Sequence, residues 1–266
     1  MTPGVIFRVA NARKNHTWCL FLALVLLFAR PAAAQELRVM ISGAFSAPFA
    51  QVVPEFESTS KYKIITISGA SMGGAPDSIP VRLEKGEPAD VLILAASALE
   101  ELIRQGKALS GSRVDLVKSS IGMAVRSGAR KPDISTSEAL KRTLLEAKSV
   151  AYSASASGVY IASELFPRLG IAEQMRGKSR RIESERVGAV VARGDAEIGF
   201  QQISELLPIP GIDYVGPLPA EVQRVTVFSA GVAANSRQRD AARALIAYLA
   251  SSRIDAAIVK SGLERP

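Results

Sequence analysis

Three short loops of small and hydroxyl-bearing residues are the parts of this 266-residue sequence best suited to bind a ligand. They are Ser42–Ser46 (SGAFS), Gly69–Gly74 (GASMGG) and Ser153–Gly158 (SASASG). Each follows a predicted strand, and ligands of open parallel sheets bind where strands end and such loops lead into helices. Free N–H groups at the start of a helix favour an anion there. A single loop of this kind is more often a simple turn, but three together indicate a binding site for a small anion.

Residues for covalent or acid–base catalysis are scarce. The only cysteine is Cys19 and the only histidine is His16, and both lie in an N-terminal segment that we expect to be removed. The remaining chain then has no thiol nucleophile, no thiolate metal site and no histidine base. It also lacks the GxxxxGK[ST] and GxSxG patterns. Lys118 and Lys178 are candidate bases only by elimination, since lysine is mostly exposed. We therefore expect no cofactor, no metal and no enzymatic activity.

Three carboxylate pairs could in principle serve as general acids or bases. They are Glu100–Glu101, Glu183 with Glu185, and Asp195 with Glu197. Glu100 falls in a predicted capping box, and the other pairs flank a predicted helix and a turn. Because acids in such positions are mostly exposed, we interpret these pairs as solvated.

The first 34 residues have the order of a secretory signal peptide. Arg8, Arg13 and Lys14 precede the apolar run Leu20–Phe28, and Pro31–Ala34 offers a small-residue cleavage site before Gln35. The alternative, a membrane anchor, would need an apolar run of about 20 residues. The sequence therefore predicts export to the periplasm.

Removal of the segment lowers the formal charge from +8 to +4, because it carries four basic residues and no acidic ones. The densest basic run, Arg176–Arg181, is followed by Glu183 and Glu185. We interpret it as a solvated helix-to-loop surface and expect no nucleic-acid partner.

Strands and helices are predicted to alternate along the remaining chain. Strands are expected at 37–41, 62–67, 90–94, 120–126, 150–153, 197–201, 213–215 and 222–233. Helices are expected at 46–57, 79–85, 97–105, 135–147, 157–169, 185–193 and twice near the C-terminus. Capping boxes are predicted for Ser97 with Glu100 and for Ser135 with Glu138. This alternation is typical of βαβ units and a mostly parallel sheet.

Several segments resemble the type II periplasmic binding proteins, specifically the molybdate-binding branch of ABC transporter receptors. The segments are 39–49, 67–91 with its GEPADV stretch, 121–125, 157–160, 186–190, 194–199 and 242–249. The resemblance implies an α/β, two-lobed fold in which each lobe is a mostly parallel sheet flanked by helices. It also implies two hinge crossovers, with lobe 1 formed by 35–124 plus 225–266 and lobe 2 by 125–224.

The resemblance places the ligand in the cleft between the lobes. The family's first serine donor falls near Ala44, so Ser42, Ser46 or the backbone would replace it, and its tyrosine falls near Gln202. An amide pair at 201–202 would suit a small organic acid at least as well as an oxyanion. The predicted ligand contacts are Ser42, Gly43, Ala44, Ser46, Ser71, Met72, Ser155, Ser157, Gly158, Val187, Gln201 and Gln202.

The function implied by the resemblance is that of a periplasmic receptor for an ABC transporter permease. It would act as a monomer and bind a small anion, either a molybdate-like oxyanion or a small organic acid. Two alternatives remain open at this point: a periplasmic ligand sensor with the same fold, and a hydrolase or transferase of unknown mechanism.

Overall fold

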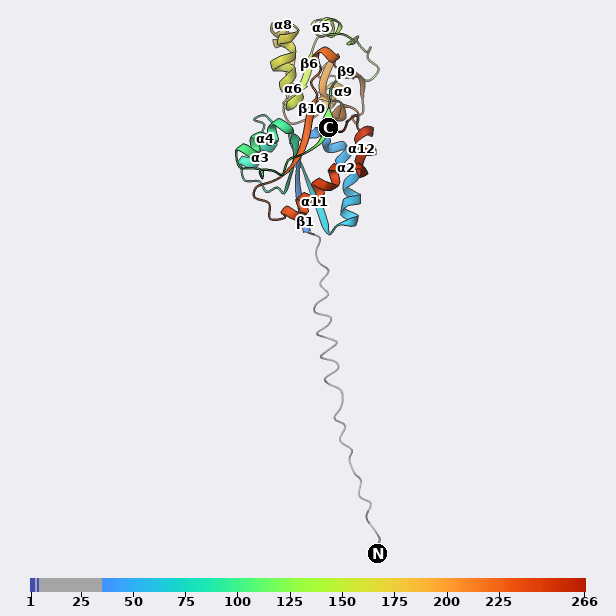
Figure 1. The fold of residues 1–266 in the computed structure, drawn as a ribbon. Helices are drawn as coiled ribbons and strands as arrows, with labels where there is room; N and C mark the ends of the chain where they lie inside the picture. The colour runs from blue at the N-terminus through green and yellow to red at the C-terminus, as the bar shows by residue number, and fades with distance from the viewer. Residues whose placement is uncertain (3, 5–34) are drawn as a thin grey trace. The chain divides into compact units, whose positions relative to one another are not determined.

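The computed structural model describes residues 1, 2, 4 and 35–266. The sequence features that predict a signal peptide therefore fall outside the described residues. Residues 35–266 form one unit with two five-stranded sheets (Figure 1). We call the part around the first sheet (35–119 and 226–266) lobe 1, and the part around the second (121–222) lobe 2.

The sheet of lobe 1 has the strand order β2-β1-β3-β10-β4. Its strands are β1 (Gln35–Ile41), β2 (Tyr62–Ser68), β3 (Val91–Ala95), β4 (Val114–Ser119) and β10 (Thr226–Val232). β1, β2 and β3 are parallel, whereas β10 is antiparallel to β3 and to β4. Within this sheet β10 thus runs opposite to the other four strands.

Helices cover both faces of this sheet (Figure 1). Alternate residues of a strand face opposite sides, so Ile93 packs with α2 and α11, while Leu92 and Leu94 pack with α3 and α4. The helices are α2 (Gly43–Thr59), α3 (Ile79–Glu84), α4 (Ala96–Arg104), α11 (Arg239–Ala250) and α12 (Asp255–Lys260). Because β3 is buried on both faces, all five of its residues are apolar.

Lobe 2 repeats the same strand order, as β7-β6-β8-β5-β9. Its strands are β5 (Ile121–Arg126), β6 (Val150–Ser153), β7 (Ser179–Ile182), β8 (Ile198–Gln202) and β9 (Ile212–Pro217). Here β5 is the strand that runs opposite to the others. The helical segments are α5 (Ser137–Glu146), α6 (Ala156–Tyr160) continued by residues 161–168, α8 (Ala172–Arg176), α9 (Val187–Ala192) and α10 (Ile203–Leu206). The predicted α/β two-lobed fold with mostly parallel sheets is confirmed.

The chain passes between the sheets at Ser120 and again between Val222 and Thr226. The Gln223 side chain joins the two crossovers, since its amide accepts from Ile121 N and donates to Ile121 O, both at 3.0 Å. The predicted lobe boundary between residues 124 and 125 would fall inside β5, which belongs wholly to the second sheet. Chain crossing at Ser120 keeps β5 intact.

Several local predictions differ from the structure. β4 was not predicted, and β7 lies in the run interpreted as a solvated surface; it is a sheet-edge strand with exposed Arg180 and Arg181, as suits an unpaired edge. α2 begins three residues earlier than predicted. α4 has no side-chain cap, and α5 is capped by Thr136, whose Oγ1 accepts from Ala139 N at 3.1 Å, rather than by Ser135.

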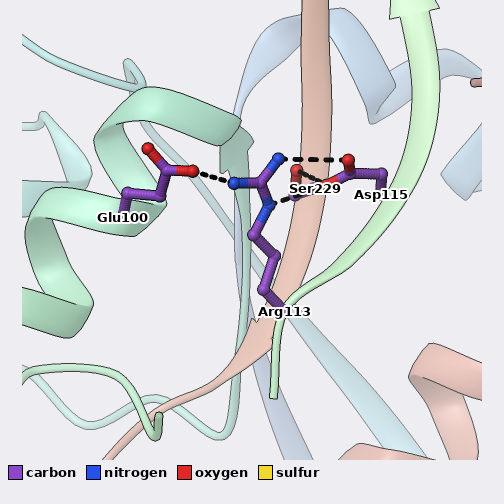
Figure 2. Close-up of polar contacts among 4 residues, drawn as sticks. All are labelled: Glu100, Arg113, Asp115 and Ser229. Atoms are coloured by element: carbon purple, nitrogen blue, oxygen red, sulfur yellow. Dashed lines mark hydrogen bonds and ion pairs between the residues drawn. The ribbon is translucent and has the colours of Figure 1, made fainter. Parts of the chain in front are cut away.

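A polar cluster on lobe 1 shows how Glu100, one acid of the predicted carboxylate pairs, finds its partner (Figure 2). The Arg113 guanidinium binds both carboxylate oxygens of Asp115, at 2.7 and 3.0 Å, and also contacts Glu100. Ser229 Oγ donates to Asp115 at 2.6 Å. The hydrogen bonds from Arg113 hold the pKa of Asp115 below its usual value. The cluster ties α4 to β4 and β10, so Glu100 takes part in a surface ion network.

Candidate functional site

A cleft of about 200 Å³ lies between the two lobes. Lobe 1 contributes residues 43, 46, 68–70 and 77 to its lining, and lobe 2 contributes residues 153–155, 182–186, 201 and 205. Sites for drug-sized ligands measure about 300–1,000 Å³. The cleft therefore suits a smaller solute.

The lobe 1 wall is built around the start of α2. This helix has 17 residues and begins at Gly43, directly after β1, so that its N-terminal turn faces the cleft. Its Ncap residue, Ser42, makes no side-chain cap hydrogen bond. The aligned peptide dipoles of a helix this long favour negative charge at its N-terminal end.

The lobe 2 wall carries an acid, Glu205, held by an amide. Gln201 Nε2 donates to Glu205 Oε1 at 2.9 Å, and Gln201 Oε1 accepts from Val187 N at 3.0 Å. Glu205 keeps some exposure through the cleft, yet the surrounding protein removes enough water to raise its pKa to about 7. The nearby positive charge of Arg186 and the hydrogen bond from Gln201 act in the opposite direction. Desolvation of the carboxylate dominates.

Gly43 and Glu205 meet across the cleft. A methyl group placed on Gly43 would overlap the Glu205 carboxyl group. The absence of a side chain at Gly43 thus lets the acid of lobe 2 approach the first turn of α2 in lobe 1.

Arg186 is the cation that lines this cleft. It precedes α9 and is partly buried. Two other arginines of this region are paired with acids of the cleft lining: Arg181 with Glu183, and Arg193 with Glu185, at 2.7 Å each. Within residues 35–266 the Arg186 guanidinium has no ion pair, which leaves it available for an anionic ligand.

Three hydrogen bonds join the lobes around the cleft. Ser71 N donates to Ser155 Oγ at 3.1 Å, and Ser184 Oγ donates to Asp77 Oδ1 at 3.1 Å. Ser204 Oγ donates to Ala44 O at 2.8 Å. Such contacts between lobes accompany hinge closure and hold the two lobes together at the cleft.

The structure brings four of the predicted ligand contacts into the cleft lining: Gly43, Ser46, Ser155 and Gln201. The other eight are not among its lining residues: Ser42, Ala44, Ser71, Met72, Ser157, Gly158, Val187 and Gln202. Most have other partners. Ser71 Oγ accepts from Ala95 N at 2.9 Å, and the hydroxyls of Ser157 and Ser153 are 3.0 Å apart.

Gln202 lies at the crossovers rather than in the cleft. With its amide oriented to satisfy both ends, it donates to Ser119 Oγ at 2.8 Å and accepts from Thr226 Oγ1 at 3.3 Å. Met72 packs against the apolar clusters of lobe 1. Gly158 is required by packing, since a methyl group there would overlap Ser153 O.

Sequence reasoning missed Glu205, Arg186 and Asp77. Its interpretation of Glu183 and Glu185 as solvated agrees with their exposure, although both also line the cleft. No periodicity or motif distinguishes Glu205 in the stretch Ile203–Leu206. Its environment depends on Gly43, which is far away in the chain and belongs to the other lobe.

Among the described residues, no helix is long and apolar enough to cross a membrane. The same residues contain no group of three or more histidine, cysteine or acidic side chains arranged to hold a metal ion.

Comparison with known proteins adds four findings. Residues 37–264 match the family model of the bacterial extracellular solute-binding proteins. An aconitate isomerase of Pseudomonas sp. is 46% identical over 249 residues, which are 92% of this chain and 95% of that protein. The molybdate-binding protein ModA of Azotobacter vinelandii is 26% identical over 84% of this chain and 87% of its own length. The solved structure of the periplasmic molybdate-binding protein of Azotobacter vinelandii, at 20% identity, has a TM-score of 0.68 and covers 86% of this chain and 99% of its own.

The similarity to an aconitate isomerase corrects one prediction. The expectation that the chain is not an enzyme is wrong, because a protein 46% identical over nearly the whole chain is an enzyme. The absence of cysteine and histidine after residue 34 argued against chemistry that needs those residues. It did not exclude chemistry by a carboxyl group whose pKa is raised by burial.

Proposed function

Because the chain belongs to the bacterial extracellular solute-binding proteins, in the molybdate-binding-like branch, we propose that its inter-lobe cleft binds a small polycarboxylate and isomerises an aconitate-type double bond. The observation that carries the proposal is the 46% identity with an aconitate isomerase over 92% of this chain. The cleft supports it, since its volume suits a small solute and Arg186 offers an unpaired cation.

The reaction requires temporary loss of the double-bond character that fixes cis or trans geometry. Aconitate has a CH₂ group beside its C=C bond. Moving a proton from that CH₂ to the far alkene carbon shifts the double bond by one carbon, and the new alkene forms in either geometry. The alternative, addition of a thiol followed by its loss, needs a cysteine, and residues 35–266 contain none. The proton-transfer route fits the residues present.

The cleft offers complementary groups to such a ligand. Arg186 can pair with one carboxylate in a two-point hydrogen bond, and the first turn of α2 can accept a second. Glu183 and Glu185 also line the cleft, but their charges are offset by Arg181 and Arg193. Glu183 and Glu185 therefore repel a ligand with several carboxylates less than two unpaired acids would.

A second candidate function is that of a receptor that passes a small solute to a transporter. It is favoured by the family match and by the 26% identity with a molybdate-binding protein. In that case the same cleft would hold a small anion, oxyanion or organic acid. The exported chain, acting as a monomer after removal of its signal peptide, would deliver the solute to a membrane permease.

The test is to incubate the purified protein with cis- or trans-aconitate and follow both isomers by proton NMR. We expect each isomer to be converted to the same equilibrium mixture. In parallel, thermal unfolding is measured with aconitate, citrate, molybdate and sulfate; a ligand at 100 times its Kd should stabilise by about 2.7 kcal/mol. Stabilisation by aconitate without conversion would favour a carboxylate receptor, and stabilisation by molybdate alone would favour an oxyanion receptor. Either result overturns the isomerase proposal.

A further inference from the structure

We infer that Glu205 is the catalytic residue that carries the proton between the two carbons of the substrate. This inference rests on the proposed isomerase function and names the residue that performs its chemical step.

The first support is position. Glu205 lines the cleft from lobe 2, and its carboxyl group lies against Gly43 at the start of α2. The Gln201 amide donates to Oε1 of the Glu205 carboxyl group, and the Gln201 side chain is itself held by a hydrogen bond from Val187 N. A side chain that exchanges a proton with two carbons of one small substrate has to be held in a defined position. These two hydrogen bonds hold the Glu205 carboxyl group in that way.

The second support comes from the other acids of the same cleft. Asp77 accepts a hydrogen bond from Ser184, and Glu183 is paired with Arg181. Glu185 binds Arg193 through both oxygens, and these hydrogen bonds hold the pKa of Glu185 below its usual value. An acid held in its ionised form by an arginine is a poor proton acceptor. Of the four acids that line the cleft, Asp77 and Glu205 have no ion pair in the described structure, and of these two only Glu205 is held by Gln201 against the first turn of α2.

The third support is basicity. At neutral pH a glutamate of ordinary pKa is a weaker base toward a carbon-bound proton than one whose pKa lies near 7. Burial raises the pKa of Glu205 to about 7, which places it where a side chain can both accept and return a proton near neutral pH.

The step balances within the substrate and this one side chain. The Glu205 carboxylate takes a proton from the CH₂ group, so that a C–H bond breaks and an O–H bond forms. The electron pair released moves into the adjacent bond, and the negative charge spreads onto a substrate carboxylate near Arg186. The carboxylic acid then returns its proton to the far alkene carbon, the double bond settles one carbon along, and Glu205 is regenerated.

The central experiment compares the wild-type protein with Glu205→Gln. Glutamine keeps the size and polarity of the side chain but cannot take up the proton. We expect kcat to fall at least about 100-fold, while aconitate still raises the melting temperature of the variant. Glu205→Asp, whose carboxyl is one CH₂ group shorter, should keep part of the activity. Glu173→Gln, exposed on α8 and outside the cleft, is the matched control and should behave as wild type.

Gly43→Ala provides a second variant, in which Glu205 itself is not substituted. The new methyl group should push the Glu205 carboxyl aside, lowering kcat more than it changes KM. Glu205 keeps some exposure through the cleft, so in D₂O its acid proton can exchange with solvent before it is returned. The wild-type protein should then place deuterium in the CH₂ group of part of the recovered aconitate, and Glu205→Gln should place none.

The outcomes separate this inference from the proposed function. If the wild-type protein neither converts aconitate nor exchanges its protons, the isomerase function fails. If the wild-type protein is active and Glu205→Gln keeps its activity and exchange, the function stands and the role of Glu205 is wrong. If Glu205→Gln does not fold, the pH profile of the wild-type protein is the test. We expect kcat/KM to rise as pH increases through about 7, because the Glu205 carboxyl group must be ionised to accept the proton. The other charged groups of the cleft are Asp77, Glu183, Glu185 and Arg186. A profile that is flat from pH 5 to 9 would overturn the inference.

Discussion

The two lobes share one strand order but contribute different chemistry to the cleft. Lobe 1 supplies mostly neutral groups, namely the start of α2 with Gly43 and Ser46 and the loop at 68–70, with Asp77 as its one acid. Lobe 2 supplies Arg186, Glu205, Glu183 and Glu185. The strand order that the two sheets share therefore determines the position of the cleft. The chemistry of the cleft depends on the side chains that each lobe contributes to it. We expect lobe 1 to shape the site and lobe 2 to determine its charge and reactivity.

The sharpest test of this difference is Arg186→Gln, which removes the unpaired cation of lobe 2. We expect aconitate binding to weaken by about 2–3 kcal/mol, at least about 30-fold in Kd, because a charge-assisted hydrogen bond in the cleft is lost. Isothermal titration calorimetry measures the change. Arg176→Gln, exposed on α8, serves as the control. Unchanged affinity would show that lobe 1 supplies the charge recognition.

A second test concerns the pH dependence of stability. The pKa of Glu205 is about 7 in the folded protein and near 4.5 in the unfolded chain, so the folded state retains a proton that the unfolded state has lost. The contribution of Glu205 is therefore most favourable below pH 4.5 and is lost as pH rises through 7. Relative to wild type, Glu205→Gln should gain about 1–2 kcal/mol of unfolding free energy between pH 5 and pH 8, a figure reduced for its partial exposure. Urea unfolding at both pH values measures this gain, and a constant difference would contradict the buried-acid description.

The smallest expected effect tests the contact between the lobes. Ser204→Ala removes the donor to Ala44 O but leaves the cleft lining intact. We expect aconitate affinity to fall by about 1 kcal/mol, about 5-fold, because the closed arrangement loses a hydrogen bond. Ser163→Ala, whose hydroxyl bonds to Val159 O within its own helix, is the control. Equal effects of the two substitutions would mean that this contact does not favour closure.

The sequence was a good guide to what depends on neighbouring residues. Apolar strands and the loops that follow them predicted the sheets and the region of the cleft, and the resemblance predicted two lobes. The ligand contacts predicted for Ser71 and Ser157 stay predictions. What the sequence did not reveal is the structural partner of each hydroxyl: that of Ser71 accepts from Ala95 N, and that of Ser157 lies 3.0 Å from the Ser153 hydroxyl.

Glu205 shows the same limit more strongly. Its residue type and local sequence are ordinary, and its raised pKa arises from burial, to which Gly43 of the opposite lobe contributes. A charged residue can be recognised as reactive from sequence only when the groups that desolvate it are near it in the chain, and here they are not.

The place of β10 in the first sheet has a consequence for how the protein folds. β10 pairs with both β3 and β4, which have no ladder with each other. Every strand of the second sheet, in contrast, comes from the continuous segment 121–217. During synthesis from the N-terminus, all strands of the second sheet are therefore made before the first sheet is complete. The first sheet lacks the strand between β3 and β4 until residues 226–232 have been made.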